Sequence, residues 1–173
     1  MRILLDVHSM IRCGPEPVVG EFFLHFRLSM ERFKERLSDI GLYPDVLDSA
    51  TANFLSEIIE RMGPPAPYLC HKDPRTYFYL SYLGQLFPKA KFIHMIRDGR
   101  ATILSSITRQ LSKGTEYQLL SKWERLVRMM QYECQQLGPD RCMTVRYELL
   151  VLEPERMMRK VLSRFRCLVE TVL

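Results

Sequence analysis

Three side chains near the middle of the chain have the types and spacing of an anion-binding site. Arg97 follows the apolar run Phe92–Ile96, which predicts a buried strand, while Ser105 and Arg109 lie four residues apart in a segment with helical spacing. Two guanidinium groups and a hydroxyl beside the carboxyl end of a parallel strand are suited to hold an anion. In the competing interpretation, Arg97 pairs with a carboxylate such as Asp98, and Arg109 is a solvated surface residue.

Three further residues stand at strand ends or in a turn-rich loop. Lys72 follows the short predicted strand Tyr68–Cys70, and Tyr147 ends another predicted strand, Cys142–Tyr147. The carboxyl ends of parallel strands gather at one edge of a sheet, so Lys72 is expected to face the same pocket as the anion site, unless it is a surface lysine. Tyr147 could stack on a ligand or cap the core. Glu16 lies in a loop rich in glycine and proline, where a lone carboxylate is usually exposed to solvent.

The elements that must position these residues alternate between strand and helix from Tyr68 onward. This alternation predicts an α/β fold with a short, mostly parallel sheet flanked by helices, and residues 1–173 are expected to form one domain. Met1–Met10 has helical spacing, and Arg12–Val19 is expected to be a loop or a turn into an extended piece. Helices are predicted over Phe22–Leu37, Pro44–Met62, Thr76–Leu86, Ala101–Leu111, Glu116–Leu137 and Glu153–Phe165.

Composition is that of an ordinary globular protein. The chain has 173 residues, of which 47% are hydrophobic and 26% charged, and its net charge of +5 mildly favours acidic partners. No run of eighteen apolar residues predicts a membrane span, and no secretory signal is visible. The five cysteines show neither CxxC pairs nor metal-spaced histidines, which argues against a zinc site, and their number alone does not choose a redox compartment. The sequence has no glycine-rich phosphate loop, which argues against a nucleotide kinase.

Two segments taken together carry a resemblance to a known family. Pro65–Pro74 reads PAPYLCHKDP, and Lys91–Ala101 reads KFIHMIRDGRA and continues to Ser105 and Arg109. In this ordered set the chain resembles the tyrosylprotein (protein-tyrosine) sulfotransferases over roughly Met1 to Leu162. These enzymes transfer a sulfuryl group from 3′-phosphoadenosine-5′-phosphosulfate to tyrosine phenols of secreted and membrane proteins. The resemblance therefore implies a P-loop-like sulfotransferase fold.

The resemblance also implies roles for individual residues. Glu16 matches the general base, and Lys72 matches the lysine that stabilises charge on the sulfuryl group. The residues that match the binding site for the 3′-phosphate and adenosine of the donor are Arg97, Ser105, Arg109 and Tyr147. Arg36 matches an arginine that reads acidic residues around the target tyrosine. The implied disulfides are Cys13–Cys70 and Cys134–Cys142, with Cys167 free.

By the same resemblance, the partners are acidic, tyrosine-containing proteins and a second copy of the chain, with neither nucleic acid nor metal, and the compartment is the Golgi. Some departures from the family pattern set limits on this picture. The family's first strand and phosphosulfate loop are expected just before Met1, and a second donor-binding loop is expected beyond Leu173, so the chain is expected to be an incomplete sulfotransferase domain. Val18 and Phe22 stand where the family has arginines that read acidic substrates. Little sulfate transfer is therefore expected from the chain alone. The alternatives are an inactive sulfotransferase-like scaffold or binding partner, and an incomplete gene model of an active enzyme.

Overall fold

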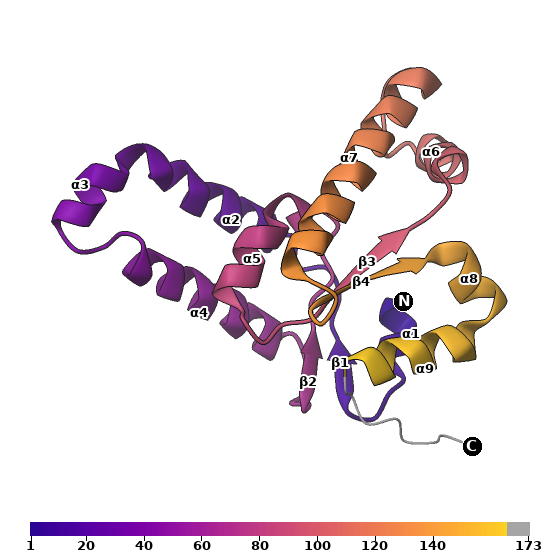
Figure 1. The fold of residues 1–173 in the computed structure, drawn as a ribbon, viewed down its shortest axis with the longest axis horizontal. Helices are drawn as coiled ribbons and strands as arrows, with labels where there is room; N and C mark the ends of the chain where they lie inside the picture. Colours follow the sequence, from indigo (N-terminus) through magenta and orange to yellow (C-terminus); the bar gives the residue numbers. More distant parts are fainter. Residues whose placement is uncertain (166–173) are drawn as a thin grey trace. The chain divides into compact units, whose positions relative to one another are not determined.

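The chain forms two compact units in the computed structural model, which describes residues 1–165 (Figure 1). The first unit is Met1–Pro88, and the second begins at Lys89. Each unit contains one pair of parallel strands with helices packed against it. The two units are described separately below.

In the first unit, two three-residue strands bring distant parts of the chain together. Strand β1 (Ile11–Cys13) pairs in parallel with β2 (Tyr68–Cys70), and Cys13 lies opposite Cys70 at the carboxyl end of the pair. The short helix α1 (Arg2–Asp6) packs against β1. Both strands therefore release their following loops at one edge of the sheet.

A helical hairpin connects these two strands. After β1 the chain runs outward and then returns to β2, as Figure 1 shows. The outward limb consists of α2 (Val19–Ser29), η1 (Met30–Phe33) and α3 (Lys34–Asp39), the return limb is α4 (Asp45–Arg61), and η2 (Thr76–Tyr79) and α5 (Leu80–Leu86) follow β2. The hairpin packs around Leu24 and Leu55, which are 0% and 5% exposed. Phe23 of α2 also stacks on Phe54 of α4, with ring centroids 3.9 Å apart.

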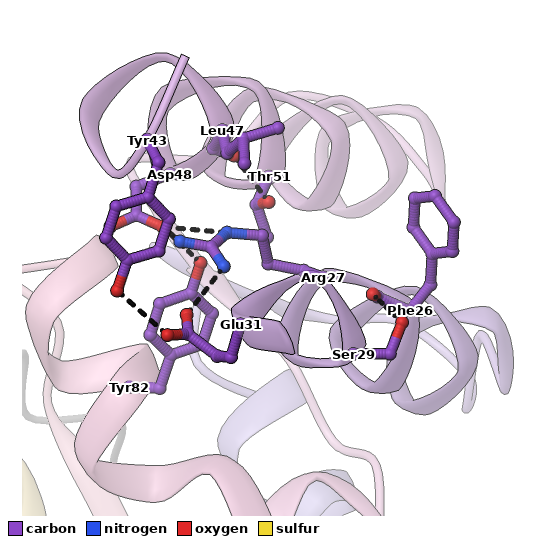
Figure 2. Close-up of polar contacts among 9 residues, drawn as sticks. All are labelled: Phe26, Arg27, Ser29, Glu31, Tyr43, Leu47, Asp48, Thr51 and Tyr82. Atoms are coloured by element: carbon purple, nitrogen blue, oxygen red, sulfur yellow. Dashed lines mark hydrogen bonds and ion pairs between the residues drawn. The ribbon is translucent and has the colours of Figure 1, made fainter. Parts of the chain in front are cut away.

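A buried arginine fixes the orientation of α2 in this hairpin (Figure 2). The Arg27 side chain is 4% exposed, and its Nε and Nη2 donate to Asp48 Oδ1 of α4 at 3.0 and 2.5 Å. Its Nη1 donates to Glu31 Oε1 at 3.0 Å. The hydroxyls of Tyr82 and Tyr43 donate to Asp48 and Glu31 at 2.6 and 2.8 Å, and partial burial of Tyr82 raises its pKa to about 12. Because each buried charge is paired and hydrogen-bonded, α2 is held in one orientation.

In the second unit, two five-residue strands form the parallel pair. Strand β3 (Phe92–Ile96) pairs with β4 (Cys142–Arg146) so that Ile96 lies opposite Arg146 at the carboxyl end. The helices of this unit are α6 (Gly99–Thr108), α7 (Glu116–Leu137), α8 (Tyr147–Leu152) and α9 (Pro154–Arg164). The core lies around Val145 of β4 and Val161 of α9, which are 0% and 1% exposed.

The parallel α/β architecture is confirmed, with differences in detail. The described strands form two separate parallel pairs, and the pairs include β1, which lies in a segment expected to be a loop. The predicted helix Phe22–Leu37 begins three residues earlier and is interrupted by the 3-10 turn η1. The predicted strand Cys142–Tyr147 ends one residue earlier, because Tyr147 starts the unpredicted helix α8.

Within residues 1–165, none of the helices combines the length and the apolar character that crossing a membrane requires. The same residues contain no cluster of three histidine, cysteine or acidic side chains placed to hold a metal ion.

Candidate active site

A candidate site in the first unit lies at the carboxyl end of the β1–β2 pair. Cys13 and Cys70, 57 residues apart, form a disulfide with their Cα atoms 4.5 Å apart. Glu16 follows Cys13 by three residues and Lys72 follows Cys70 by two, and their side chains form an ion pair. Both remain accessible, with side chains 42% and 45% exposed. The fold therefore brings a carboxylate and an ammonium group together at an open sheet edge.

A tight turn holds the backbone next to Glu16. The Val19 N–H donates to the Pro17 carbonyl at 2.6 Å, which closes a three-residue turn around Val18. Val18 has φ 62° and ψ −33°, a left-handed conformation that is uncommon for a β-branched residue and costs about 1–3 kcal/mol. The Cys13–Cys70 disulfide lies on one side of this turn, and α2, whose second residue Gly20 is buried, lies on the other. Glu16 is thus placed by a constrained loop.

Lys72 lies among several charged and polar groups. Partial burial lowers its pKa, the positive charge of Arg2 acts in the same direction, and the negative charge of Asp73 acts in the opposite one. An anion that binds beside Lys72 would favour its ammonium form.

The residues on either side of Lys72 are functional candidates that sequence reasoning missed. His71 Nδ1 and Asp73 Oδ2 are buried without a hydrogen-bond partner among the described residues. Burial lowers the pKa of His71, which therefore favours the neutral imidazole. Their position in the turn around Lys72 was the only signal that the sequence offered for them.

A candidate site in the second unit lies at the carboxyl end of the β3–β4 pair. Arg97 and Tyr147 each follow the last residue of their strand, and those last residues are paired in register. The Arg97 guanidinium lies over the Tyr147 ring, 4.8 Å from its centroid. A guanidinium that lies over an aromatic face still has N–H groups that do not contact the ring. These N–H groups can donate hydrogen bonds to an anion.

The competing interpretation for Arg97, an ion pair with Asp98, does not hold. Asp98 caps α6 by accepting from the N–H groups of Arg100 and Ala101, and its carboxylate pairs with the Arg100 guanidinium at 3.0 Å. These contacts lower the pKa of Asp98 to about 2, with the Arg100 side chain the main cause. Within residues 1–165, Arg97 and Arg109 form no ion pair, so both guanidinium groups are available to a ligand.

Arg97, Ser105 and Arg109 line one hollow of about 300 Å³. The three residues of the predicted clamp therefore line the same hollow, and the exposed Arg109 is the C-terminal cap of α6, which begins at Gly99 and ends at Thr108. Arg97 and Ser105 also line a neighbouring hollow of about 340 Å³, which includes Trp123 of α7. Two cations and a hydroxyl facing one hollow fit an anionic phosphate group. Trp123 is the only tryptophan in the chain, and this was the signal that could have marked it.

Arg36 is not brought to the Glu16–Lys72 pair. It is exposed in the last turn of α3, and Figure 1 shows α3 at the end of the hairpin far from β1. The second predicted disulfide is present, because Cys134 of α7 and Cys142 of β4 are joined with their Cα atoms 5.3 Å apart. Cys167, expected to be free, lies outside the described residues.

Comparisons with known proteins identify the family of the chain. The family model described as "Sulfotransferase family" matches residues 1–169. The chain belongs to the sulfotransferase family. A solved structure, the sulfotransferase domain from the curacin biosynthetic pathway, matches with a TM-score of 0.66 over 98% of this chain and 70% of that one. At 18% identity this match shows the fold, which is that of a sulfotransferase.

The expected resemblance to protein-tyrosine sulfotransferases is confirmed. The chain is 44% identical over 171 residues to the protein-tyrosine sulfotransferase of Drosophila melanogaster, covering 94% of this chain and 34% of that protein. It is 45% identical to protein-tyrosine sulfotransferase 1 of Homo sapiens, again over 94% of this chain and 46% of that protein. For protein-tyrosine sulfotransferase 1 of Danio rerio the identity is 43%, over 94% of this chain and 48% of that protein. The chain thus spans between a third and a half of the length of these relatives.

Proposed function

We propose that this protein transfers a sulfuryl group from 3′-phosphoadenosine-5′-phosphosulfate to the phenol oxygen of tyrosines in secreted and membrane proteins. The observation that carries the proposal is the Glu16–Lys72 ion pair at the end of the β1–β2 sheet. It unites a proton acceptor and a cation from positions far apart in the sequence, in a sulfotransferase fold whose relatives are named for tyrosine sulfation.

The chemistry requires both members of this pair. A tyrosine phenol has a pKa of about 10 and is mostly protonated at neutral pH, so a base must take its proton as the oxygen attacks sulfur. Glu16 takes that proton, while the bond between sulfur and the bridging oxygen of the donor breaks. Lys72 balances the negative charge that grows on the sulfuryl and bridging oxygens. The products are a tyrosine sulfate and 3′-phosphoadenosine-5′-phosphate.

The resting ion pair restrains this reaction until the donor is bound. A carboxylate that accepts from an ammonium group is a weaker base than a free one. The anionic donor competes with Glu16 for Lys72, and the release of Glu16 leaves it ready to accept the phenolic proton.

The 3′-phosphate end of the donor is assigned to the β3–β4 strand end. Two cations and a hydroxyl line one hollow, and they belong to Arg97, Arg109 and Ser105. The Tyr147 ring packs against the Arg97 guanidinium. Bidentate contacts between guanidinium and phosphate supply both affinity and orientation.

Several other features belong to the same proposal. Both units are proposed to be parts of one sulfotransferase domain, since the family match runs through both. The two disulfides support an oxidising compartment, proposed to be the Golgi lumen. A homodimer and a role for Arg36 in reading acidic substrates rest on the family resemblance alone.

The test is transfer of labelled sulfate from the donor to a tyrosine peptide by the 173-residue chain. We expect slow transfer, reduced about 10²–10⁴-fold in Glu16→Gln because the phenolic proton then lacks its acceptor. The matched control is Glu57→Gln, which removes an exposed glutamate that pairs with Arg61 on α4. This control should transfer at the wild-type rate. Transfer unaffected by Glu16→Gln would overturn the assignment of the base, and no transfer by the wild type would favour the inactive scaffold.

A further inference from the structure

The turn His71–Thr76, which we call the lysine turn, packs against the first turn of α2. Gly20, the second residue of α2, is buried, and a Cβ at this position would lie 3.6 Å from Asp73 Oδ2. The same Cβ would lie 3.7 Å from Thr76 Cγ2 and 3.8 Å from His71 Nε2. Because Gly20 has no side chain, the lysine turn approaches the backbone of the helix closely.

Hydrogen bonds fix the shape of the lysine turn. Asp73 Oδ1 accepts from the Arg75 N–H at 2.9 Å, and the Thr76 hydroxyl donates to the Asp73 carbonyl at 3.0 Å. Arg75 also pairs with Glu21, the residue of α2 that follows Gly20, at 3.1 Å. The lysine turn therefore contacts α2 at two consecutive residues.

The start of α2 has no cap of its own. Its N-cap residue is Val18, which makes no side-chain hydrogen bond to the first turn of the helix. Asp73 Oδ2 is buried beside this turn and has no hydrogen-bond partner among the described residues. A negative charge stabilises a helix N-terminus, where the first N–H groups lack partners within the helix. Asp73 thus supplies, from another segment, the charge that the N-cap of α2 lacks.

We propose that Asp73 is a positioning residue, which holds the start of α2 against the lysine turn and so fixes Glu16 beside Lys72. This inference rests on the proposed function. Glu16 lies three residues before α2 and Lys72 is the neighbour of Asp73, so that movement of α2 away from the turn would separate the ion pair. The Cys13–Cys70 disulfide joins the two segments before the pair, and the Asp73 contact joins them after it.

Hydrogen exchange tests this contact without any need for transfer. Asp73→Asn keeps the shape of the side chain and removes its charge. Amide exchange in the first two turns of α2 should become about two- to fivefold faster, the change expected for one charge at a helix N-terminus. The matched control is Asp45→Asn, which removes an exposed carboxylate from the first turn of α4. This control should leave exchange in α2 at the wild-type rate.

Two substitutions of Gly20 act from the other side of the same contact. The Cβ of alanine reaches ordinary van der Waals distance from the lysine turn, so Gly20→Ala should keep exchange and transfer close to the wild-type rates. Valine adds two methyl groups beyond that Cβ, next to Asp73 and Thr76. Gly20→Val should therefore push the turn away from α2 and reproduce the effects of Asp73→Asn.

The position of the ion pair can be measured directly by cross-linking. A carbodiimide joins a carboxylate to an amine that it contacts, and both Glu16 and Lys72 are accessible. Mass spectrometry should detect the Glu16–Lys72 amide in the wild type and in Asp45→Asn. Its yield should fall in Asp73→Asn and in Gly20→Val.

Transfer kinetics separate positioning from a general loss of stability. In Asp73→Asn and Gly20→Val, kcat should fall about 10- to 100-fold, because small displacements of reacting groups are costly. The affinity for 3′-phosphoadenosine-5′-phosphate should stay at the wild-type value, since the 3′-phosphate is assigned to the β3–β4 end. Urea denaturation gives the folded fraction by which kcat is corrected.

The outcomes separate this inference from the proposed function. Unchanged exchange and cross-linking in Asp73→Asn would overturn the inference, even if the wild type transfers sulfate. Faster exchange with unchanged kcat and cross-linking would also overturn it, because the contact would then not position the pair. Faster exchange and weaker cross-linking, in a chain that transfers no sulfate, would support the inference and refute the proposed activity.

Discussion

The two strand ends in this chain use the same topology for different purposes. In each unit, two parallel strands end in register, and candidate functional side chains follow each strand within three residues. At β1–β2 the result is a carboxylate paired with an ammonium group. At β3–β4 it is a guanidinium stacked on an aromatic ring, with a second guanidinium on the same hollow.

The difference lies in what satisfies each cation. Lys72 is paired with Glu16, and we propose that Glu16 accepts a proton once another anion binds Lys72. Arg97 stacks on the Tyr147 ring. The nearby Asp98 pairs with Arg100 and accepts hydrogen bonds from the first N–H groups of α6. We therefore propose that the β3–β4 end binds an external anion. The end of a parallel strand fixes where a side chain lies. We propose that the neighbouring residues determine whether that side chain transfers a proton or binds an anion.

The two strand ends also differ in their covalent support, and the largest expected effect concerns this difference. Replacing Cys13 and Cys70 by serine opens a 57-residue loop, whereas replacing Cys134 and Cys142 opens one of eight residues. Loop-closure entropy predicts losses of about 4 and about 2.5 kcal/mol in the free energy of unfolding, measured by urea denaturation. Only the first pair joins the two strands that carry Glu16 and Lys72, so only its loss should also abolish transfer.

The second disulfide pair is the control for the first. Similar transfer by the two serine double variants, after correction for the folded fraction, would show that the Cys13–Cys70 bond does not position the Glu16 loop. A larger loss of stability from the eight-residue loop would contradict the entropic account.

Two glycines provide a smaller contrast between the units. A Cβ on Gly99, the first residue of α6, would lie 2.7 Å from a ring carbon of Trp123, whereas one on Gly20 of α2 would meet nothing closer than 3.6 Å. Gly99→Ala should therefore cost about 1–3 kcal/mol through overpacking. Gly20→Ala should instead raise stability by about 0.5 kcal/mol, because alanine favours the helix. Thermal unfolding of both variants checks the opposite signs, and equal effects would contradict the close contact with Trp123.

Strand β3 was predictable from the sequence because its five residues are apolar except for His94 and the turn signal Asp98-Gly99 follows. Strand β4 was predictable as a short run after Gly138-Pro139, which stop the preceding helix. Arg97 and Ser105 were found for the same reason, since a strand, a turn and a helix fix their spacing locally. Strand β1 was missed because three residues before Gly14 and Pro15 carry no periodicity. It exists only through its pairing with β2, far along the chain.

The Glu16–Lys72 pair shows the same limit more strongly. From the residues alone, Glu16 was an ordinary loop carboxylate, and only the resemblance to a family singled it out. Its position depends on a disulfide and on the left-handed turn at Val18, neither of which is encoded by local patterning. The stacking of Arg97 on Tyr147 likewise required the register of β3 and β4, which a single sequence does not display.

We propose that the β1–β2 end accepts a proton and that the β3–β4 end binds the 3′-phosphate. The most direct test is the affinity for 3′-phosphoadenosine-5′-phosphate, measured by titration calorimetry on the wild type, Arg97→Ala and Glu16→Gln. Arg97→Ala should weaken binding about 10- to 100-fold, the loss expected for charged hydrogen bonds to a phosphate. Glu16→Gln should bind at least as tightly as the wild type, because this end acts on the proton and not on the 3′-phosphate. Unchanged affinity in Arg97→Ala, or an equal loss in Glu16→Gln, would contradict the account.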